Sequence, residues 1–400
     1  MELATRRPPP NAAGYRVPGT RPQRDAAVRL LVAASAEGGV PAEDPVRQLE
    51  EASIPVLGAL VRYHGVAGLL YEHLRGVDGV PTSLMSGLTQ AYTAATRRHM
   101  LTSAELIKVA AAFEASSVPW AVVKGPALVE TAYDGRPGRR GYSDLDVVVH
   151  PAAFRKAVDA LREMGAELFD RNWRMLRRDL RGEVLFGLPA GTPLDLHWNL
   201  INMYRRRMRV DTAEIIGRAR RMEIGTVSVP VLDPEDGVIH LALHGALSGG
   251  DRLLWLKDIE RASAVWRPDW DVVAERARRW NVAPAVGLML GRSRSVLDAD
   301  IPASVPPRLI GATSARIGRW VEKLSPWPYG MGRTGAPTRL FARSIGHGLA
   351  GGLAWIAWRS VRNLDPRQER LSSAFRARGT DEDWQAFVDA VVGTARQRNQ

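Results

Sequence analysis

The chain of 400 residues contains no cysteine. The absence of thiols excludes disulfides, cysteine-ligated metals and a cysteine nucleophile. A chain without cysteine also fits a reducing compartment, so we expect a cytoplasmic protein. The apolar and charged fractions, 45% and 24%, are those of an ordinary folded protein and exclude a chain that is disordered throughout.

Lysine is scarce, with five residues against fifty arginines in a chain of net charge +12. An arginine excess beside abundant alanine and glycine is also typical of composition bias, so the charge favours an anionic partner only weakly. Twelve arginines stand against five acidic residues between 171 and 221, which we call the Arg-rich stretch. Two interpretations stay open: a cationic rim for an anionic substrate, or solvated helix faces.

Long hydrophobic runs are also missing, since a bilayer-spanning helix needs roughly 20 apolar residues. The best candidate, 345–358, falls short of that length and contains His347 and four glycines. It predicts a buried or an interfacial helix, and we expect no stable membrane insertion. Near the N-terminus, Arg6 and Arg7 are followed by three prolines, a pattern unlike a secretory signal.

The spacing of apolar residues divides the chain into four parts. Residues 1–25, rich in Pro, Arg and Gly, predict a disordered tail. Apolar residues three and four apart predict an N-terminal helical region over 26–118. Short β-prone runs predict a small core of strands and helices over 119–232, with a hairpin turn at 189–192. Helical patterns then continue over 233–400 as a C-terminal helical region. The expected fold class is therefore α+β, with a small mixed sheet flanked by helices.

Three carboxylates in predicted strands carry the strongest chemical signal. Asp144 and Asp146 lie two residues apart in a predicted strand over 143–150, so their side chains share one face. Asp195 stands between two leucines in a later predicted strand. Three acids on an apolar sheet repel one another unless a divalent cation lies among them. Because Mg²⁺ prefers carboxylate, water and phosphate oxygens, the set predicts phosphoryl or nucleotidyl transfer with two metal ions.

A Lys-Gly pair precedes these acids. Lys124 and Gly125 stand where a short apolar strand is predicted to pass into a helix. Glycine lets the backbone approach a phosphate, the start of a helix offers free N–H groups, and lysine supplies a positive charge. Each feature alone is common, but the order strand, Lys-Gly, helix, Asp-x-Asp and third acid is specific. We predict that this turn binds nucleotide phosphates.

This ordered pattern resembles the DNA polymerase beta-like nucleotidyltransferase superfamily, and more closely its bacterial branch, the uncharacterised nucleotidyltransferase family. The resemblance covers about residues 55–300. Its motifs here are Val123-Lys124-Gly125, Arg140, Asp144 and Asp146, Asp195-Leu196-His197-Trp198, His240 and His244, and Trp255-Leu256-Lys257-Asp258. The wider superfamily usually has Gly-Ser or Gly-Gly after the first strand, where this chain has Lys-Gly. The grip on the triphosphate is therefore expected to differ.

The resemblance implies an enzyme that moves a nucleoside monophosphate from an NTP, ATP among them, to an acceptor hydroxyl and releases pyrophosphate. Asp144 and Asp146 would bind the Mg²⁺ that bridges the triphosphate. Asp195 would join a second Mg²⁺ beside the attacking hydroxyl and draw off its proton, with Mn²⁺ as a substitute metal. The residues expected to bind the nucleotide are Lys124, Gly125, Arg140 and Ser143.

Three histidines are expected around this site. His197 shares the face of Asp195, and we expect it to hold that carboxylate in place or to touch substrate. His240 and His244 lie four residues apart on one helical face, where packing, hydrogen bonding or a wall of the substrate pocket would explain them. Leu241 stands between them, so the glutamate of a zinc-protease motif is missing.

The acceptor stays open at this point: a small molecule, a peptide or protein side chain, or an RNA end. Two alternatives to a general nucleotidyltransferase also remain. One is a catalytically silent nucleotide-binding or regulatory module, against which the three acids argue. The other is a toxin-like enzyme that adds nucleotides to tRNA, for which the sequence offers no aromatic stacking platform.

Overall fold

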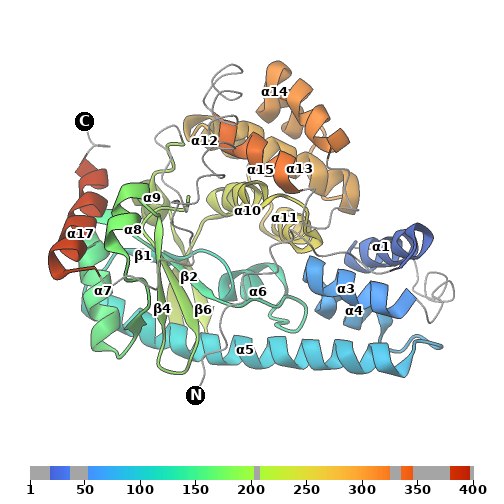
Figure 1. Cartoon of the computed structure of the whole chain (residues 1–400), viewed down its shortest axis with the longest axis horizontal. Helices are drawn as coiled ribbons and strands as arrows, with labels where there is room; N and C mark the ends of the chain where they lie inside the picture. Colours follow the sequence, from blue (N-terminus) through green and yellow to red (C-terminus); the bar gives the residue numbers. More distant parts are fainter. Residues whose placement is uncertain (1–18, 37–52, 202–207, 325–334, 346–378, 397–400) are drawn as a thin grey trace.

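The computed structural model is an α+β fold, with one mixed sheet flanked by helices, as predicted (Figure 1). The residues that the structure describes are 19–36, 53–201, 208–324, 335–345 and 379–396. Predictions for 1–18, for 346–358 and for the arginines at 205–207 lie outside them. Within the described residues, no helix combines the length and apolar character that crossing a bilayer demands.

Four helices of the described chain precede the sheet. They are α1 (Arg21–Ser35), α3 (Ile54–His64), α4 (Ala67–Leu74) and α5 (Thr82–Ala115). The start of α1 corrects the prediction that disorder extends to residue 25. Thr20 and Gln23 form a reciprocal capping box there, and Pro22 lies in the first turn, where a missing N–H costs nothing.

The described strands form a seven-stranded sheet in the order β3-β4-β5-β2-β1-β7-β6. Their bounds are β1 (Trp120–Val122), β2 (Leu145–Val149), β3 (Glu167–Leu168), β4 (Glu183–Gly187), β5 (Pro193–His197), β6 (Arg220–Ile224) and β7 (Val227–Val231). The β2–β5 and β1–β7 pairs are parallel and the others antiparallel, so the sheet is mixed. The predicted hairpin around 189–192 is confirmed as β4 and β5.

Short helices connect the strands. These are α6 (Pro126–Ala132), the short 3-10 helix η2 (Pro151–Ala153), α7 (Phe154–Glu163), α8 (Trp173–Asp179) and α9 (Thr212–Gly217). The helices that follow the sheet are α10 (Pro234–Ser248), α11 (Leu253–Trp266), α12 (Trp270–Arg279), α13 (Ala283–Leu297), α14 (Val305–Leu324), α15 (Gly335–Ser344) and α17 (Asp381–Arg396).

Strand alternation gives the sheet two different faces. On one face, Val147 and Leu196 join an apolar cluster with Phe113 of α5, Phe154 of α7 and Phe387 of α17. These three helices lie together around the sheet in Figure 1. The opposite face carries both apolar residues and the acids, because each acid alternates with a residue of the apolar cluster. The chemistry is therefore confined to one face.

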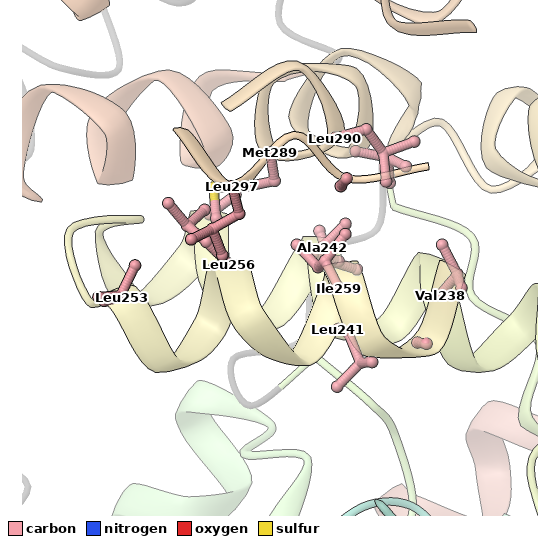
Figure 2. Close-up of a cluster of buried hydrophobic side chains, with 14 of the residues drawn as sticks. Val238, Leu241, Ala242, Leu253, Leu256, Ile259, Met289, Leu290 and Leu297 are labelled. Atoms are coloured by element: carbon pink, nitrogen blue, oxygen red, sulfur yellow. The ribbon is translucent and has the colours of Figure 1, made fainter. Parts of the chain in front are cut away.

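A second apolar cluster joins that opposite face to the remaining helices. It runs from Leu30 and Leu57 in the N-terminal helices, through Val148 of β2, to α10, α11 and α13. Figure 2 shows part of it, where Ala242 of α10 and Ile259 of α11 face Met289 and Leu290 of α13. The N-terminal helices, the sheet and the C-terminal helices thus share one core.

Acid is expected to destabilise this core through His64. Its ring is buried at the end of α3, and Nδ1 accepts a hydrogen bond from the Leu253 backbone N–H at 3.1 Å. Burial, with the Arg252 charge, lowers the pKa of His64 to about 3. The unfolded chain binds this proton below about pH 6.5 and the folded chain does not. The contribution of neutral, buried His64 to the free energy of unfolding is therefore complete above pH 6.5 and is lost as the pH falls toward 3.

Urea unfolding at pH 7 and pH 5 would measure the loss, about 2 kcal/mol from His64 alone. His64→Asn, which keeps an acceptor near the position of Nδ1, should lower stability at pH 7 but flatten the dependence on pH. An unchanged difference between the two pH values in this variant would assign the acid sensitivity to other groups.

Candidate active site

A glycine turn brings the end of β1 against the start of β2. The Val123 N–H donates to the Asp146 carbonyl at 3.0 Å, so pairing continues past the strand end. Gly125 then adopts φ 69° and ψ −114°, a conformation that residues with a Cβ rarely take. A Cβ there would also lie 3.2 Å from the Asp144 carbonyl oxygen. Glycine therefore allows the close approach that places Lys124 beside the acids.

Two of the three predicted acids occupy directly paired positions. Asp146 of β2 and Asp195 of β5 are register partners in the parallel pair, where strands lie about 4.8 Å apart. Both side chains lie on the same face, and both residues are buried. Asp144 lies just before β2 rather than in the predicted strand, and its side chain is 21% exposed. The strand pairing thus places Asp146 and Asp195 side by side on one face of the sheet, in two of its interior strands.

The ammonium of Lys124 lies between the first two acids. Its Nζ donates to Asp146 Oδ2 and lies 3.8 Å from Asp144 Oδ1. Burial lowers the pKa of Lys124, but the charges of Asp146 and Asp144 outweigh it and raise the pKa above the ordinary value. For Asp146, burial raises the pKa, but the Lys124 charge and the hydrogen bond with His197 outweigh it and bring the pKa well below its usual range. Both groups are therefore charged at neutral pH.

His197 contacts a different carboxylate from the one that the sequence predicted. Its Nε2 lies 3.1 Å from Asp146 Oδ1, and its Nδ1 lies 3.4 Å from Glu183 Oε2. The strand register explains the contact with Glu183, because His197 lies directly opposite Glu183 of β4; on the other side it pairs with Val148, two residues past Asp146. Burial lowers the pKa of His197, but the hydrogen bond to Asp146 and the charge of Glu183 raise it. His197 therefore orients Asp146.

Glu183 and Arg181 are members of the site that the sequence analysis missed. Arg181 Nη2 donates to Glu183 Oε1 at 3.0 Å, and Arg181 also lies 3.7 Å from Asp170 Oδ1. The predicted hairpin could have revealed Glu183 as a neighbour of His197. With a turn at 189–192, antiparallel pairing places residue 183 opposite 197, so an acid facing His197 was foreseeable.

Arg140 is engaged by an acid from another motif. Its guanidinium makes two hydrogen bonds to Asp258 of α11, at 2.8 and 2.9 Å, and both side chains are buried. Tyr133 Oη donates to the same carboxylate at 2.8 Å. The Arg140–Asp258 pair connects the loop before β2 to α11. Arg140 Nη1 makes no hydrogen bond within the described chain, and Ser143 is exposed beside Asp144. Nucleotide contacts by these two residues stay a prediction.

Two neutral histidines of α10 lie close to this cluster. Their ring centroids are 6.0 Å apart, and His244 meets Trp255 edge-on. Burial lowers the pKa of His244 to about 4 and that of His240 well below its usual range, and the Lys124 charge acts in the same direction on both. Neither ring nitrogen of His240 has a hydrogen-bond partner among the described residues. A role in the substrate pocket stays a prediction for both.

Much of the Arg-rich stretch is paired within the protein. Arg181 contacts Glu183, Arg218 contacts Asp236 of α10, and Arg174 contacts Asp383 of α17. These ion pairs favour a structural interpretation for these arginines over an open cationic rim. A cavity of about 630 Å³ lies elsewhere, between α5 at Arg97–Arg98 and the hairpin turn. The three acids do not line it.

The donor chemistry of the site suits Mg²⁺, because Asp144, Asp146 and Asp195 supply only hard carboxylate oxygens. A cation is already accommodated there, in the form of the Lys124 ammonium. In the described part of the chain, no three His, Asp or Glu side chains gather closely enough to hold a metal ion. The residue types thus suit Mg²⁺, their arrangement in this structure does not by itself form a metal site, and the cation beside Asp146 is the Lys124 ammonium.

Comparison with known proteins places the chain in a family. None of the curated proteins matches it. Among solved structures, the chain is similar to the antibiotic-resistance factor ANT(2'')-Ia, with 14% identity over 49% of this chain and 92% of that chain, and a TM-score of 0.32. A likeness this distant carries no conclusion. Residues 50–298, more than half of the chain, match a family described as uncharacterised nucleotidyltransferase. The chain therefore belongs to the uncharacterised nucleotidyltransferase family.

Proposed function

We propose that this nucleotidyltransferase transfers a nucleoside monophosphate from an NTP to an acceptor hydroxyl, with Mg²⁺ and with release of pyrophosphate. The observation that carries the proposal is the pairing of Asp146 with Asp195 beside the Lys124–Gly125 turn. Asp144, Asp146 and Asp195 would hold the metal, which supplies positive charge to the phosphate oxygens when bound. A cytoplasmic setting, suggested by the absence of cysteine, is part of the same proposal.

Each of the surrounding residues has a role in this scheme. The turn at Gly125 lets phosphates approach the backbone, and Lys124 offers its charge to them. Asp195 accepts the proton of the attacking hydroxyl, and His197 keeps Asp146 in one orientation through Nε2. The chemistry is then mainly positioning and charge stabilisation, as phosphoryl-group transfers require.

One observation favours a second candidate, a nucleotide-binding module without turnover. The ion pair between Lys124 and Asp146 satisfies the acidic cluster without any metal. A protein that kept this pair on binding nucleotide would have no means of transfer. The identity of the acceptor does not separate the enzyme from the binding module, because a small molecule, a protein side chain and an RNA end all present a hydroxyl.

Transfer of label from NTP separates the two candidates. Each of the four NTPs, labelled at the α-phosphate or at the γ-phosphate, is incubated with protein, Mg²⁺ and fractions of cell extract. We expect α-label in one fraction with one preferred NTP, and none after chelation of the metal. Label arriving from the γ-phosphate would contradict nucleotidyl transfer. Binding of NTP without transfer to any fraction would favour the silent module.

A further inference from the structure

The acidic cluster carries its own cation. Asp146 is 2% exposed, Asp195 is 8% exposed, and the Lys124 side chain is 16% exposed. Buried carboxylates this close together would repel one another strongly without a neighbouring positive charge. Lys124 Nζ supplies that charge, through its bond to Asp146 Oδ2 and its position 3.8 Å from Asp144 Oδ1.

We propose that Lys124 is a resident counter-ion that holds the place of the metal, and that metal enters only when nucleotide phosphates draw the ammonium away. This inference rests on the proposed function for the identity of the nucleotide, and goes beyond it by coupling the two ligands. Lysine then acts at two positions, on the carboxylates in the free protein and on the phosphates in the complex.

The contacts of Asp146 place Lys124 and an entering metal ion in competition. Its Oδ1 faces His197 Nε2 at 3.1 Å and its Oδ2 faces the ammonium, so a cation entering at either oxygen competes with a group already there, and at Oδ2 with the charge of Lys124. Two positive charges at one oxygen repel each other, and burial weakens the screening of that repulsion by water. The metal therefore binds weakly while Lys124 stays in place.

The position of Lys124 in the chain permits it to leave. Lys124 follows the end of β1 and precedes Gly125, so it belongs to a turn rather than to a strand held by the ladder. Its ammonium is carried on a flexible four-carbon stem, which can redirect the charge without moving the backbone. Phosphates at the same turn would offer it an alternative partner of the same sign as the carboxylates.

Mn²⁺ binding, followed by the electron paramagnetic resonance of free Mn²⁺, tests the coupling without any measurement of activity. Titrations are made with and without a non-hydrolysable NTP analogue, on the wild type, Lys124→Met and Lys156→Met. Lys156 is exposed on α7, so its variant removes the same charge far from the acids. In the wild type, the analogue should tighten Mn²⁺ binding by about 5- to 150-fold, the usual range of coupling between two sites.

Without nucleotide, Lys124→Met should bind Mn²⁺ at least about tenfold more tightly than the wild type, and its coupling to the analogue should shrink. Lys156→Met should behave as the wild type. Equal Mn²⁺ affinity of Lys124→Met and wild type without nucleotide would overturn the proposal. So would wild-type Mn²⁺ affinity that the bound analogue leaves unchanged.

Two further arms keep the test decisive. Lys124→Arg restores a positive charge and should return Mn²⁺ affinity toward the wild-type value. If Lys124→Met is poorly stable, Mn²⁺ alone should raise its melting temperature and leave that of the wild type unchanged; no rise would count against the counter-ion. An analogue that fails to bind the wild type would contradict the proposed function, while Mn²⁺ affinity without nucleotide still decides the role of Lys124.

Discussion

Asp146→Asn is expected to lower nucleotidyl transfer by roughly a hundredfold or more, the scale of losing a major electrostatic contribution to a transition state. The substitution keeps the size of the side chain and removes one negative charge from the proposed metal site. That charge matters more in the transition state than in the folded protein, so kcat should fall more than nucleotide affinity. The assay is transfer of α-phosphate label, with both proteins side by side.

The structure changes what this variant should do to folding. Relief of repulsion among three acids would by itself leave the fold unharmed or slightly more stable. The bonds from Lys124 and His197 to Asp146 reverse that expectation, because the ammonium and the imidazole ring both lose a charged partner in a buried site. We expect a loss on the order of 1–3 kcal/mol in the free energy of unfolding.

Asp236→Asn is the matched control for this loss of stability. Asp236 is a buried aspartate of α10 that pairs with Arg218 and Arg276, outside the acidic cluster. Transfer per folded molecule should survive in Asp236→Asn and fail in Asp146→Asn. Comparable transfer by both variants would remove Asp146 from the catalytic assignment.

Arg140→Met is expected to lower the free energy of unfolding by about 3–5 kcal/mol, because it leaves the buried Asp258 carboxylate without its cation. The bidentate pair joins residues 118 positions apart and carries Tyr133 Oη on the same acid. Urea unfolding measures the loss. The double variant Arg140→Met with Asp258→Leu should recover much of it, since replacing a whole buried pair by apolar groups is often close to neutral. A double variant as unstable as the single one would contradict this account.

Arg140→Lys separates the structural role from the predicted nucleotide contact. Lysine keeps the charge but cannot reproduce the two-pronged bond to Asp258. If Arg140 only ties its loop to α11, stability should fall and the affinity of the folded protein for NTP should not. A large loss of NTP affinity with stability intact would restore Arg140 to the nucleotide site.

Local patterns in the sequence were sufficient to predict which side chains share the face of the sheet that carries the acids. Alternation of acids with valine and leucine places Asp146, Asp195 and His197 on one side of their strands, whatever the rest of the fold does. The hairpin at 189–192 was equally local, because its turn residues and flanking β-prone runs are contiguous. The chain order of the motifs then sufficed to predict the family that the match over 50–298 shows.

Only the tertiary structure decided which charges meet. Lys124 reaches Asp146, His197 turns to Asp146 rather than Asp195, and Arg140 is engaged by Asp258, none of which follows from spacing along the chain. Periodicity reports the face on which a side chain lies, and a partner is chosen by strand order, register and helix packing. Buried charges pair with whatever the fold brings within reach, because leaving one unpaired costs more than most local preferences contribute.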